Sequence, residues 1–358
     1  MTSVISLFSL PSRKPELAKP MKILLVKLSS LGDVVHTLPV VQDILAAMPD
    51  AQIDWVVEKA FAPLLTQVKG LQRIIPCELR RWRKSLLSAQ TWREWRAFKA
   101  DLQTARYDAV IDLQGLTKSA LVARLARLTQ TGKRYAMANQ TDGSGFEAPT
   151  RWVADVAIAL VPRIHAVARA RLLAAQALGY DVKRLEIAPN YGIKVPLAQS
   201  IRAQAAPENI AFIHGTSRQD KTWPLQNWVE LGQRFAAHGY QIALVHGSVK
   251  ELVTSQTIAA QLGGHGIACV VWPMLSLDEL TQQLATCQGA IGVDSGVSHI
   301  AVALGLPHVQ IYNFATAWRT GPLGSAHQVS VLEKAGPTVD AVWQLWLQCI
   351  SPQESGLP

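Results

Sequence analysis

The sequence predicts an α/β fold with two doubly wound parallel sheets that face a common cleft. Short apolar segments alternate with helical segments along most of the 358 residues. This alternation stops once, in a proline-containing stretch over Tyr180–Asn209, and then begins again. Apolar strands that alternate with helices are typical of parallel sheets covered by helices on both faces. We therefore expect two such sheets in one chain.

The N-terminal part is expected to contain three strands and four helices. The strands are apolar runs at Lys22–Lys27, Gln52–Val57 and Tyr107–Leu113. The helices are expected over Val34–Ala47, Ala89–Ala105, Gly115–Leu128 and His165–Leu178, the last of which ends at Gly179. Thr131–Thr150 is rich in Gly, Asn, Asp and Ser, and we expect a loop there.

The C-terminal part repeats the scheme. Strands are expected at Ile210–His214, Tyr240–Val245, Ile267–Val271, Ala290–Val293 and His308–Ile311. Helices are expected at Gln226–His238, Lys250–Leu262, Ser276–Ala285, Ser295–Leu304 and Val339–Leu347. The domains predicted from this pattern are 21–185 and 209–335, joined by a linker at 186–208 and followed by a helix and tail at 336–358. Residues 1–20 precede a second methionine and are expected to be a disordered leader or a misplaced start.

The composition limits the class of protein. The formal net charge is +9, which favours an anionic partner such as a nucleic acid, a membrane surface or a phosphorylated substrate. No apolar run is long enough to span a bilayer, so we expect a soluble protein. The four cysteines are scattered and indicate neither disulfides nor a zinc site, which fits a reducing cytoplasm.

The densest cationic run is Arg80-Arg81-Trp82-Arg83-Lys84. A solvated helix face is the simple alternative to a binding role. A nucleic-acid partner is not expected, because only Trp82, Trp92 and Trp95 offer base-stacking aromatics near these cations.

Asp33 follows Gly32 where the first strand gives way to a helix. Ligands of doubly wound sheets bind beyond the carboxyl ends of the strands. Asp33 is therefore a candidate general base for a hydroxyl, and a simple helix cap is the alternative. His36 lies one turn later and offers a second base, but we expect it to be a histidine that packs its helix.

Two polar turns in the C-terminal part resemble anion sites. The loop from His214 to Pro224 carries hydroxyls and Lys221, which are the donors that a departing diphosphate needs. The turn from Asp294 to His299 opens a helix whose first N–H groups can bind an anion. An ordinary polar loop and a packed core histidine are the alternatives. Glu251 either complements a helix dipole or binds a ribose.

Several common catalytic patterns are absent. The sequence contains no G-x-G-x-x-G, G-x-x-x-x-G-K-[ST], H-E-x-x-H or G-x-S-x-G pattern, and we see no metal-ligand cluster. This disfavours dehydrogenases, P-loop NTPases and zinc proteases.

Four segments together resemble a known family. They are KLSSLGDVVHTLP at Lys27–Pro39, RRWRK at Arg80–Lys84, DKTWP at Asp220–Pro224 and VDSGVSH at Val293–His299. In this order they resemble the bacterial lipopolysaccharide heptosyltransferases of glycosyltransferase family 9, over about residues 21–324. The first two segments are most similar to the heptosyltransferase I type. The resemblance implies a GT-B fold, in which two Rossmann-like domains face a cleft and a C-terminal helix packs back on the first domain.

The resemblance also implies a reaction, the transfer of heptose from ADP-L-glycero-D-manno-heptose to Kdo of Kdo2-lipid A, with inversion and without a metal or cofactor. It implies that Asp33 is the general base and that Lys221 stabilises the leaving group. The implied donor residues are Thr216, Ser217, Lys221, Glu251, Asp294, Ser295, Gly296 and His299. The implied acceptor residues are Ser30, Arg80, Arg81, Arg83 and Lys84. The implied location is cytoplasmic, at the inner face of the inner membrane.

Some features leave alternatives open. Tyr312–Thr316 reads YNFAT where the family is expected to carry Tyr-Gly-Pro-Thr, so nucleotide contacts there are not assigned. Another ADP-heptose transferase, of the heptosyltransferase II type or a protein heptosyltransferase, would differ in its acceptor. A nucleotide-sugar 2-epimerase on the same fold would need no anionic acceptor.

Overall fold

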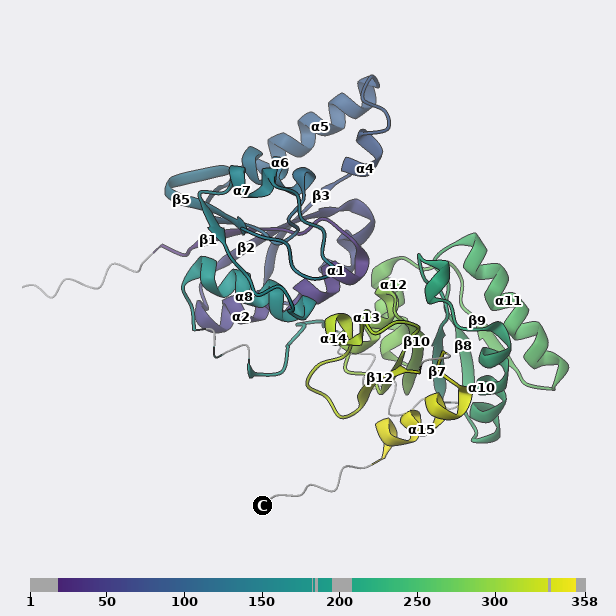
Figure 1. Ribbon diagram of the computed structural model, residues 1–358. Helices are drawn as coiled ribbons and strands as arrows, with labels where there is room; N and C mark the ends of the chain where they lie inside the picture. Colours follow the sequence, from purple (N-terminus) through teal and green to yellow (C-terminus); the bar gives the residue numbers. More distant parts are fainter. Residues whose placement is uncertain (1–18, 182, 184–185, 195–207, 334–335, 352–358) are drawn as a thin grey trace, which may run out of the picture.

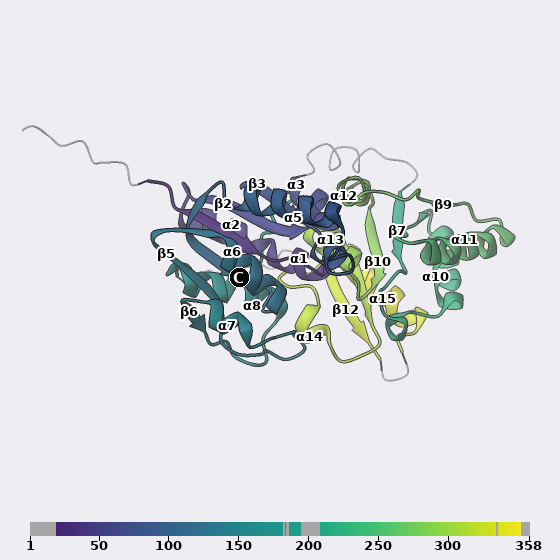
Figure 2. The ribbon, with the colours of Figure 1, turned by 90° about the horizontal axis from the view of Figure 1, so that it is seen from above.

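The computed structural model describes residues 19–181, 183, 186–194, 208–333 and 336–351. Within them the chain forms two six-stranded sheets, which Figures 1 and 2 show side by side with helices on both faces. Every paired strand in both sheets is parallel. The predicted fold class is thereby confirmed. The leader residues 1–18, the linker residues 195–207 and the tail residues 352–358 lie outside the described residues, and the domain boundaries stay a prediction.

The first sheet has the strand order β3-β2-β1-β4-β5-β6. Its strands are β1 (Lys22–Val26), β2 (Gln52–Glu58), β3 (Leu71–Cys77), β4 (Arg106–Asp112), β5 (Arg127–Met137) and β6 (Val156–Ile158). One face packs on α1 (Leu31–Thr37), α2 (Pro39–Ala47), α3 (Ala62–Thr66) and α8 (Ala166–Leu178). The other packs on α4 (Leu79–Trp82), α5 (Ala89–Leu102) and α6 (Thr117–Leu125). The short helices η1 (Lys59–Phe61) and α7 (Pro149–Val153) complete this half.

The second sheet has the strand order β12-β11-β10-β7-β8-β9. Its strands are β7 (Asn209–Ile213), β8 (Gln241–Leu244), β9 (Cys269–Val271), β10 (Gly289–Val293), β11 (His308–Tyr312) and β12 (Gln328–Leu332). One face packs on α12 (Leu277–Ala285) and α13 (Gly296–Ala303). The other packs on α10 (Leu225–Ala237), α11 (Val249–Gly264) and α15 (Val339–Ile350). The short helices η3 (Gln219–Lys221) and α14 (Ala317–Thr320) lie in loops.

The helix predicted after the first strand is two helices. α1 begins at Leu31, so Asp33 lies inside its first turn rather than before the helix. Leu38 separates α1 from α2, whose first residue is Pro39. Proline has no N–H group to continue the ladder of α1, but its fixed φ suits the first position of a new helix.

The loop predicted over Thr131–Thr150 is partly wrong, because β5 continues to Met137. The preceding helix accordingly ends at Leu125 instead of Leu128. Most side chains of β5 before Ala136 are partly or fully exposed, so the strand carries polar residues and shows no apolar run.

The C-terminal helix α15 packs on its own half of the chain, beside β11, β12 and α10 (Figure 1). The expectation that it packs back on the first domain is therefore wrong. Its buried Trp343 and Trp346 rings lie 5.1 and 5.2 Å from the ring of Phe235 on α10. Gly289 on β10 leaves room for Trp346, because a Cβ atom there would lie 2.5 Å from the indole. This close fit of the indole fixes the helix to the second sheet.

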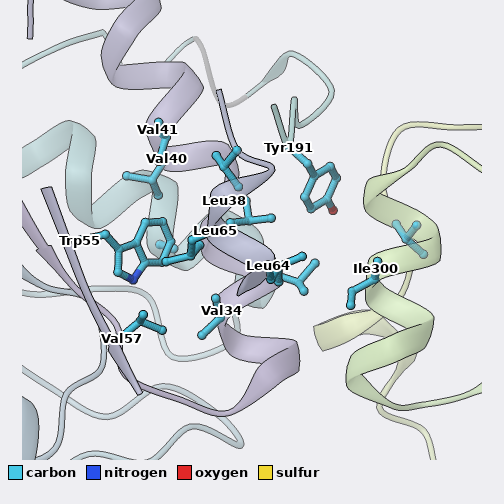
Figure 3. Packing of buried hydrophobic residues seen from close by; sticks show 14 of the residues in the cluster. Val34, Leu38, Val40, Val41, Trp55, Val57, Leu64, Leu65, Tyr191 and Ile300 are labelled. Atoms are coloured by element: carbon cyan, nitrogen blue, oxygen red, sulfur yellow. The ribbon is translucent and has the colours of Figure 1, made fainter. Parts of the chain in front are cut away.

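One hydrophobic core runs through both halves. The cluster contains Val34, Leu38 and Leu64 from the first half and Ile300 of α13 from the second. Figure 3 shows Ile300 facing Leu64 and Tyr191 across the space between the halves. Burial of apolar surface thus holds α13 against the first half. This contact brings the carboxyl ends of the strands of both sheets to a common cleft.

Candidate active site

A cleft of about 420 Å³ lies between the carboxyl ends of the two sheets. The first half contributes residues after β1 and β4, and the second half contributes residues after β7 and β10. Six cationic side chains line the cleft: Lys27, Arg80, Lys118, Arg169, Lys221 and Arg319. Two carboxylates, Asp33 and Asp294, lie among them. The cleft therefore favours an anionic ligand.

Asp33 is held at the N-terminus of α1 by its neighbour Ser30. Ser30 donates its backbone N–H and its hydroxyl to Asp33 Oδ2, at 3.1 and 2.8 Å. On the other oxygen, Lys27 Nζ and an Arg169 nitrogen approach Oδ1 to 3.7 and 3.9 Å. The carboxylate remains 36% exposed to the cleft. The N-cap of α1 is Ser30 and not Asp33, which is the third helical residue and completes a capping box with Ser30, so the simple alternative of Asp33 as the N-cap is wrong. The capping box orients the carboxylate and leaves it open to the cleft.

The charges around Asp33 decide its protonation. Burial alone would raise the pKa of this carboxyl, but the Lys27 ammonium and the Ser30 hydrogen bonds outweigh it, so the pKa lies well below its usual value. Burial in turn lowers the pKa of Lys27, whose ammonium also donates to the Leu113 carbonyl at 3.0 Å. Asp33 is thus ionised at neutral pH, which is the form that a general base needs, but the same charges lower its basicity.

Asp294 and Lys221 form an ion pair on the opposite wall. Lys221 Nζ lies 2.5 Å from Asp294 Oδ2, and His299 Nε2 lies 3.4 Å from Oδ1. Burial would raise the pKa of Asp294, but His299 and Lys221 lower it below its usual value. Ser295 accepts from the Ser298 N–H at 3.4 Å and so caps α13, as predicted. The N-terminus of α13 therefore opens into the cleft beside a lysine.

The two halves touch where α1 meets α13. A Cβ atom on Gly32 would lie 2.8 Å from His299, and one on Gly296 would lie 2.7 Å from Leu31. The rings of His36 and His299 are 4.1 Å apart across this contact. Gly296 therefore serves the approach of one helix to the other as well as lining the cleft. His36 is buried and packed, as expected.

The remaining donor candidates lie around the ends of β7 and β8. Ser217 lines the cleft. Thr216 lies behind it and donates to the Asp294 carbonyl at 3.5 Å. Glu251 accepts from the Gly247 N–H at 2.7 Å, and its carboxyl lies against Gly215. The structure thus brings Ser217, Thr216 and Glu251 together at the carboxyl ends of the strands of the second sheet.

The cationic run is divided by the structure. Arg80 lines the cleft. Arg81 is bound by Glu78 and Glu94 on the surface. Arg83 lines a separate apolar groove, and Lys84 is exposed. Of the four predicted acceptor cations, only Arg80 lines this cleft, as does Ser30.

Four cleft cations were not predicted as site residues: Lys27, Lys118, Arg169 and Arg319. Lys27 stands at the carboxyl end of β1, which is a recognisable signal. Arg169 lies in an alanine-rich helix with a second arginine, Arg171, and nothing in the sequence distinguishes the two. Arg319 donates to the Gly143 carbonyl of the other half at 2.7 Å, a contact that only the folded chain creates.

Two kinds of feature are absent from the described residues. No described helix is long and apolar enough to cross a bilayer. Nor do three His, Cys, Asp or Glu side chains gather as metal ligands anywhere in the described part of the chain.

Comparison with known proteins decides the family. The model of glycosyltransferase family 9 (heptosyltransferase) matches residues 95–345, which is more than half of the chain. The chain belongs to glycosyltransferase family 9. It is therefore a glycosyltransferase rather than an epimerase, and the predicted resemblance is confirmed.

Among family 9 proteins, the chain is 37% identical to lipopolysaccharide heptosyltransferase 1 of Escherichia coli (strain K12) over 294 residues, 82% of this chain and 88% of that protein. The solved E. coli heptosyltransferase WaaC with ADP is similar at 34% identity and a TM-score of 0.78, over 90% of this chain and 98% of that one. The same enzyme with ADP-2-deoxy-2-fluoro heptose gives 33% and 0.74, with the same coverage of both chains. The GT-B fold implied by the sequence is confirmed by this similarity.

Proposed function

We propose that this family 9 glycosyltransferase moves L-glycero-D-manno-heptose from ADP-heptose to Kdo of Kdo2-lipid A, the reaction of the heptosyltransferase I type. One observation carries the proposal. An ionised carboxylate from the first half, Asp33, and a lysine with a helix N-terminus from the second, Lys221 and α13, line one cleft. The relatives named above support the donor and the acceptor class.

The proposed reaction is a single displacement that inverts the anomeric carbon. A Kdo hydroxyl oxygen attacks C1 of the heptose, and the bond from C1 to the ADP oxygen breaks. The hydroxyl proton passes to Asp33 Oδ1 or Oδ2, and ADP leaves with the electron pair. Inversion needs the base and the leaving group on opposite faces of the sugar, and this is supported by Asp33 and Lys221 lining the cleft from different halves of the chain.

We assign the leaving group to the second half. Negative charge develops on the ADP diphosphate as the bond breaks, and Lys221, Ser217 and the free N–H groups of α13 supply compensating donors. No metal ion or cofactor is included in the proposed mechanism. Glu251 is assigned to the adenosine ribose, Thr216 to support of the diphosphate loop, and Asp294 and His299 to the position of Lys221.

We assign the acceptor to the first half. Kdo carries a carboxylate, and Arg80, Lys27 and Arg169 are cations within the cleft. An acceptor carboxylate beside Lys27 and Arg169 would offset the charge that lowers the pKa of Asp33, and so raise the basicity of Asp33 when the substrate is bound. We also propose that the enzyme works at the cytoplasmic face of the inner membrane, where a basic protein is attracted to anionic lipids.

The test is heptose transfer by Asp33→Asn. The amide keeps the shape and still accepts from Ser30, but it cannot take a proton at neutral pH. We expect kcat to fall by about 10²–10⁴-fold, with the Kd for ADP-heptose unchanged. The assay follows ADP release and the mass of Kdo2-lipid A.

Asp50→Asn is the matched control, because Asp50 is exposed and precedes β2, at the amino ends of the strands. It should transfer heptose at the wild-type rate. Normal turnover by Asp33→Asn would remove Asp33 as the base, and wild-type protein that binds ADP-heptose without transferring heptose to Kdo would point to another acceptor.

A further inference from the structure

A second cavity, of about 380 Å³, opens on the first half between α4, α5 and α6. We call it the apolar groove, and its apolar lining consists of Leu79, Trp82, Leu86, Trp92, Trp95 and Leu121. Its volume is within the range of small-molecule sites. Leu86, Trp92 and Leu121 are 61, 53 and 47% exposed, so water contacts much of this lining. Concave apolar surface left in water is unusual on a protein and indicates a ligand or partner.

The walls of the apolar groove are packed firmly. The ring of Trp82 lies 5.8 Å from Trp95 and 5.7 Å from Phe98, which joins α4 to α5. The Trp82 indole N–H donates to Glu94 at 2.8 Å. The polar atom of this buried ring is therefore satisfied within the protein, and the groove offers its occupant almost purely apolar contacts.

The groove adjoins the active-site cleft at Lys118. This residue lines both cavities, and its ammonium reaches into the cleft to donate to Ser29 Oγ at 2.9 Å. Arg80 and Arg83, one turn apart on and after α4, line the cleft and the groove respectively. The cations Arg80, Arg83 and Lys118 therefore lie where the cleft and the groove adjoin, and the rest of the groove lining is mostly apolar.

We infer that the apolar groove holds a fatty-acyl chain of the lipid acceptor while its anionic sugar lies in the cleft. This inference rests on the proposed function and adds a subsite to it. An amphiphile whose carboxylate and phosphate groups meet Arg80, Arg83 and Lys118 would direct its hydrocarbon into the groove. The groove would offset the cost of drawing that chain out of a bilayer or micelle, because the chain stays in apolar surroundings.

The acyl chain fits the observations better than a bilayer surface does. A bilayer contacts side chains that project, and the most exposed apolar residue of this region is Leu87, at 100%. Leu87 does not line the apolar groove. A groove residue and Leu87 therefore provide a matched pair of variants, one inside the concave site and one beside it.

The experiment compares two acceptors in steady-state transfer: Kdo2-lipid A dispersed in detergent, and the same headgroup after complete chemical deacylation. Leu121→Ser should raise KM for the acylated acceptor by about three- to tenfold, since each methylene contact is worth roughly fourfold in affinity. It should leave KM for the deacylated acceptor and for ADP-heptose unchanged. Leu87→Ser should change none of them. Leu121 is an exposed helix residue, so its replacement should not prevent folding.

Other outcomes would overturn the inference. Equal effects of both variants on the acylated acceptor would assign the region to insertion in a bilayer or micelle. An equal effect of Leu121→Ser on both acceptors would show a disturbance of the cleft, and no effect would show an empty groove. Transfer by wild-type protein to Kdo2-lipid A tests the proposed function separately, because absence of transfer to either acceptor would remove the proposed function and this inference with it.

Discussion

At the scale of single residues, the ion pair of Lys221 with Asp294 poses a question of role. The lysine lines the cleft, but it also neutralises a buried carboxylate at 2.5 Å. A donor diphosphate must therefore share Lys221 with Asp294. Loss of the lysine would remove a cation from the leaving group and would also remove the ammonium that neutralises the buried carboxylate of Asp294.

We expect Lys221→Met to weaken ADP-heptose binding by about tenfold and to lower kcat by about 10²-fold. The methionine keeps the length of the side chain and removes its charge. Donor titration and the transfer assay measure the two effects. Lys250→Met, an exposed lysine at the start of α11, should change neither.

The double variant Lys221→Met/Asp294→Asn distinguishes the two roles. If Lys221 contacts the diphosphate, the double variant stays as slow as the single one. Recovery of activity in the double variant would show that the lysine acts only as the counter-ion of Asp294, and the assignment to the leaving group would be wrong.

Arg80 and Arg81 are neighbours in sequence with different surroundings. Arg80 lines the cleft, whereas Arg81 donates hydrogen bonds to Glu78 and Glu94, which raise the pKa of Arg81. We expect Arg80→Met to raise the KM of the acceptor by about tenfold without affecting ADP-heptose binding. Arg81→Met should leave the KM of the acceptor and the Kd of ADP-heptose near their wild-type values. Equal effects of the two variants would show that Arg81 also contributes to acceptor binding.

These residues show how far the sequence defines the site. Asp33, Lys221 and Ser295 follow strands, and sequence reasoning brought them to one cleft because parallel strands end at a common edge. Arg169 could not be found this way, because its position depends on where α8 crosses α1. The division of Arg80 from Arg81 depends on two carboxylates, Glu78 and Glu94, which lie 3 and 13 residues from Arg81 and which the local pattern does not connect.

At the scale of elements, position within the sheet explains most of the difference between predicted and unpredicted strands, with the predicted edge strand β9 as the exception. The predicted strands β1, β4, β7 and β10 are central and almost fully buried. The unpredicted β3, β6 and β12 lie at sheet edges, and β5 lies next to an edge. Edge strands face water, tolerate polar residues and proline, as at Pro76, and so lose the apolar run that signals a strand.

The contact of α1 with α13 joins the two catalytic walls. Gly296→Ala would place a Cβ atom 2.7 Å from Leu31, so the helices must separate by a few tenths of an ångström or more. We expect kcat to fall by about tenfold, because small misplacements of catalytic groups are costly. The transfer assay measures the fall, and thermal unfolding shows whether the fold survives.

Gly263→Ala is the control for this substitution. Nothing lies within 4 Å of a Cβ atom at that helical position of α11. Alanine there should leave kcat unchanged and raise stability by up to about 1 kcal/mol, since glycine is a poor helix former. If Gly296→Ala likewise kept full activity, the close approach of the two helices would not position the walls.

At the scale of the whole molecule, buried histidines and a buried aspartate change the free energy of unfolding in opposite directions as the pH falls. Burial lowers the pKa of His308 on β11 and of His214 after β7 to about 4. Burial raises the pKa of Asp112 at the end of β4 to about 6. The histidines are neutral in the folded protein and bind protons on unfolding below pH 6.5, so they remove stability as the pH falls from 6.5 to 4. Asp112 takes up a proton in the folded state first, so it adds stability between pH 6 and 3.8.

His308→Asn isolates one of these terms. His308 is fully buried and bonds the Ala290 carbonyl through Nδ1 at 2.9 Å, a contact that an asparagine amide can replace. At pH 7 the variant should be less stable than wild type, because the smaller side chain leaves a cavity. Between pH 6.5 and 4 the wild type should lose about 3 kcal/mol that the variant does not lose. The two free energies of unfolding should therefore converge or cross as the pH falls, as measured by urea titration at each pH.

Asp112→Asn should have the opposite pH dependence, so its free energy of unfolding should fall relative to wild type as the pH falls from 6 to 3.8. A difference between wild type and His308→Asn that is constant with pH would show that His308 does not titrate in this range.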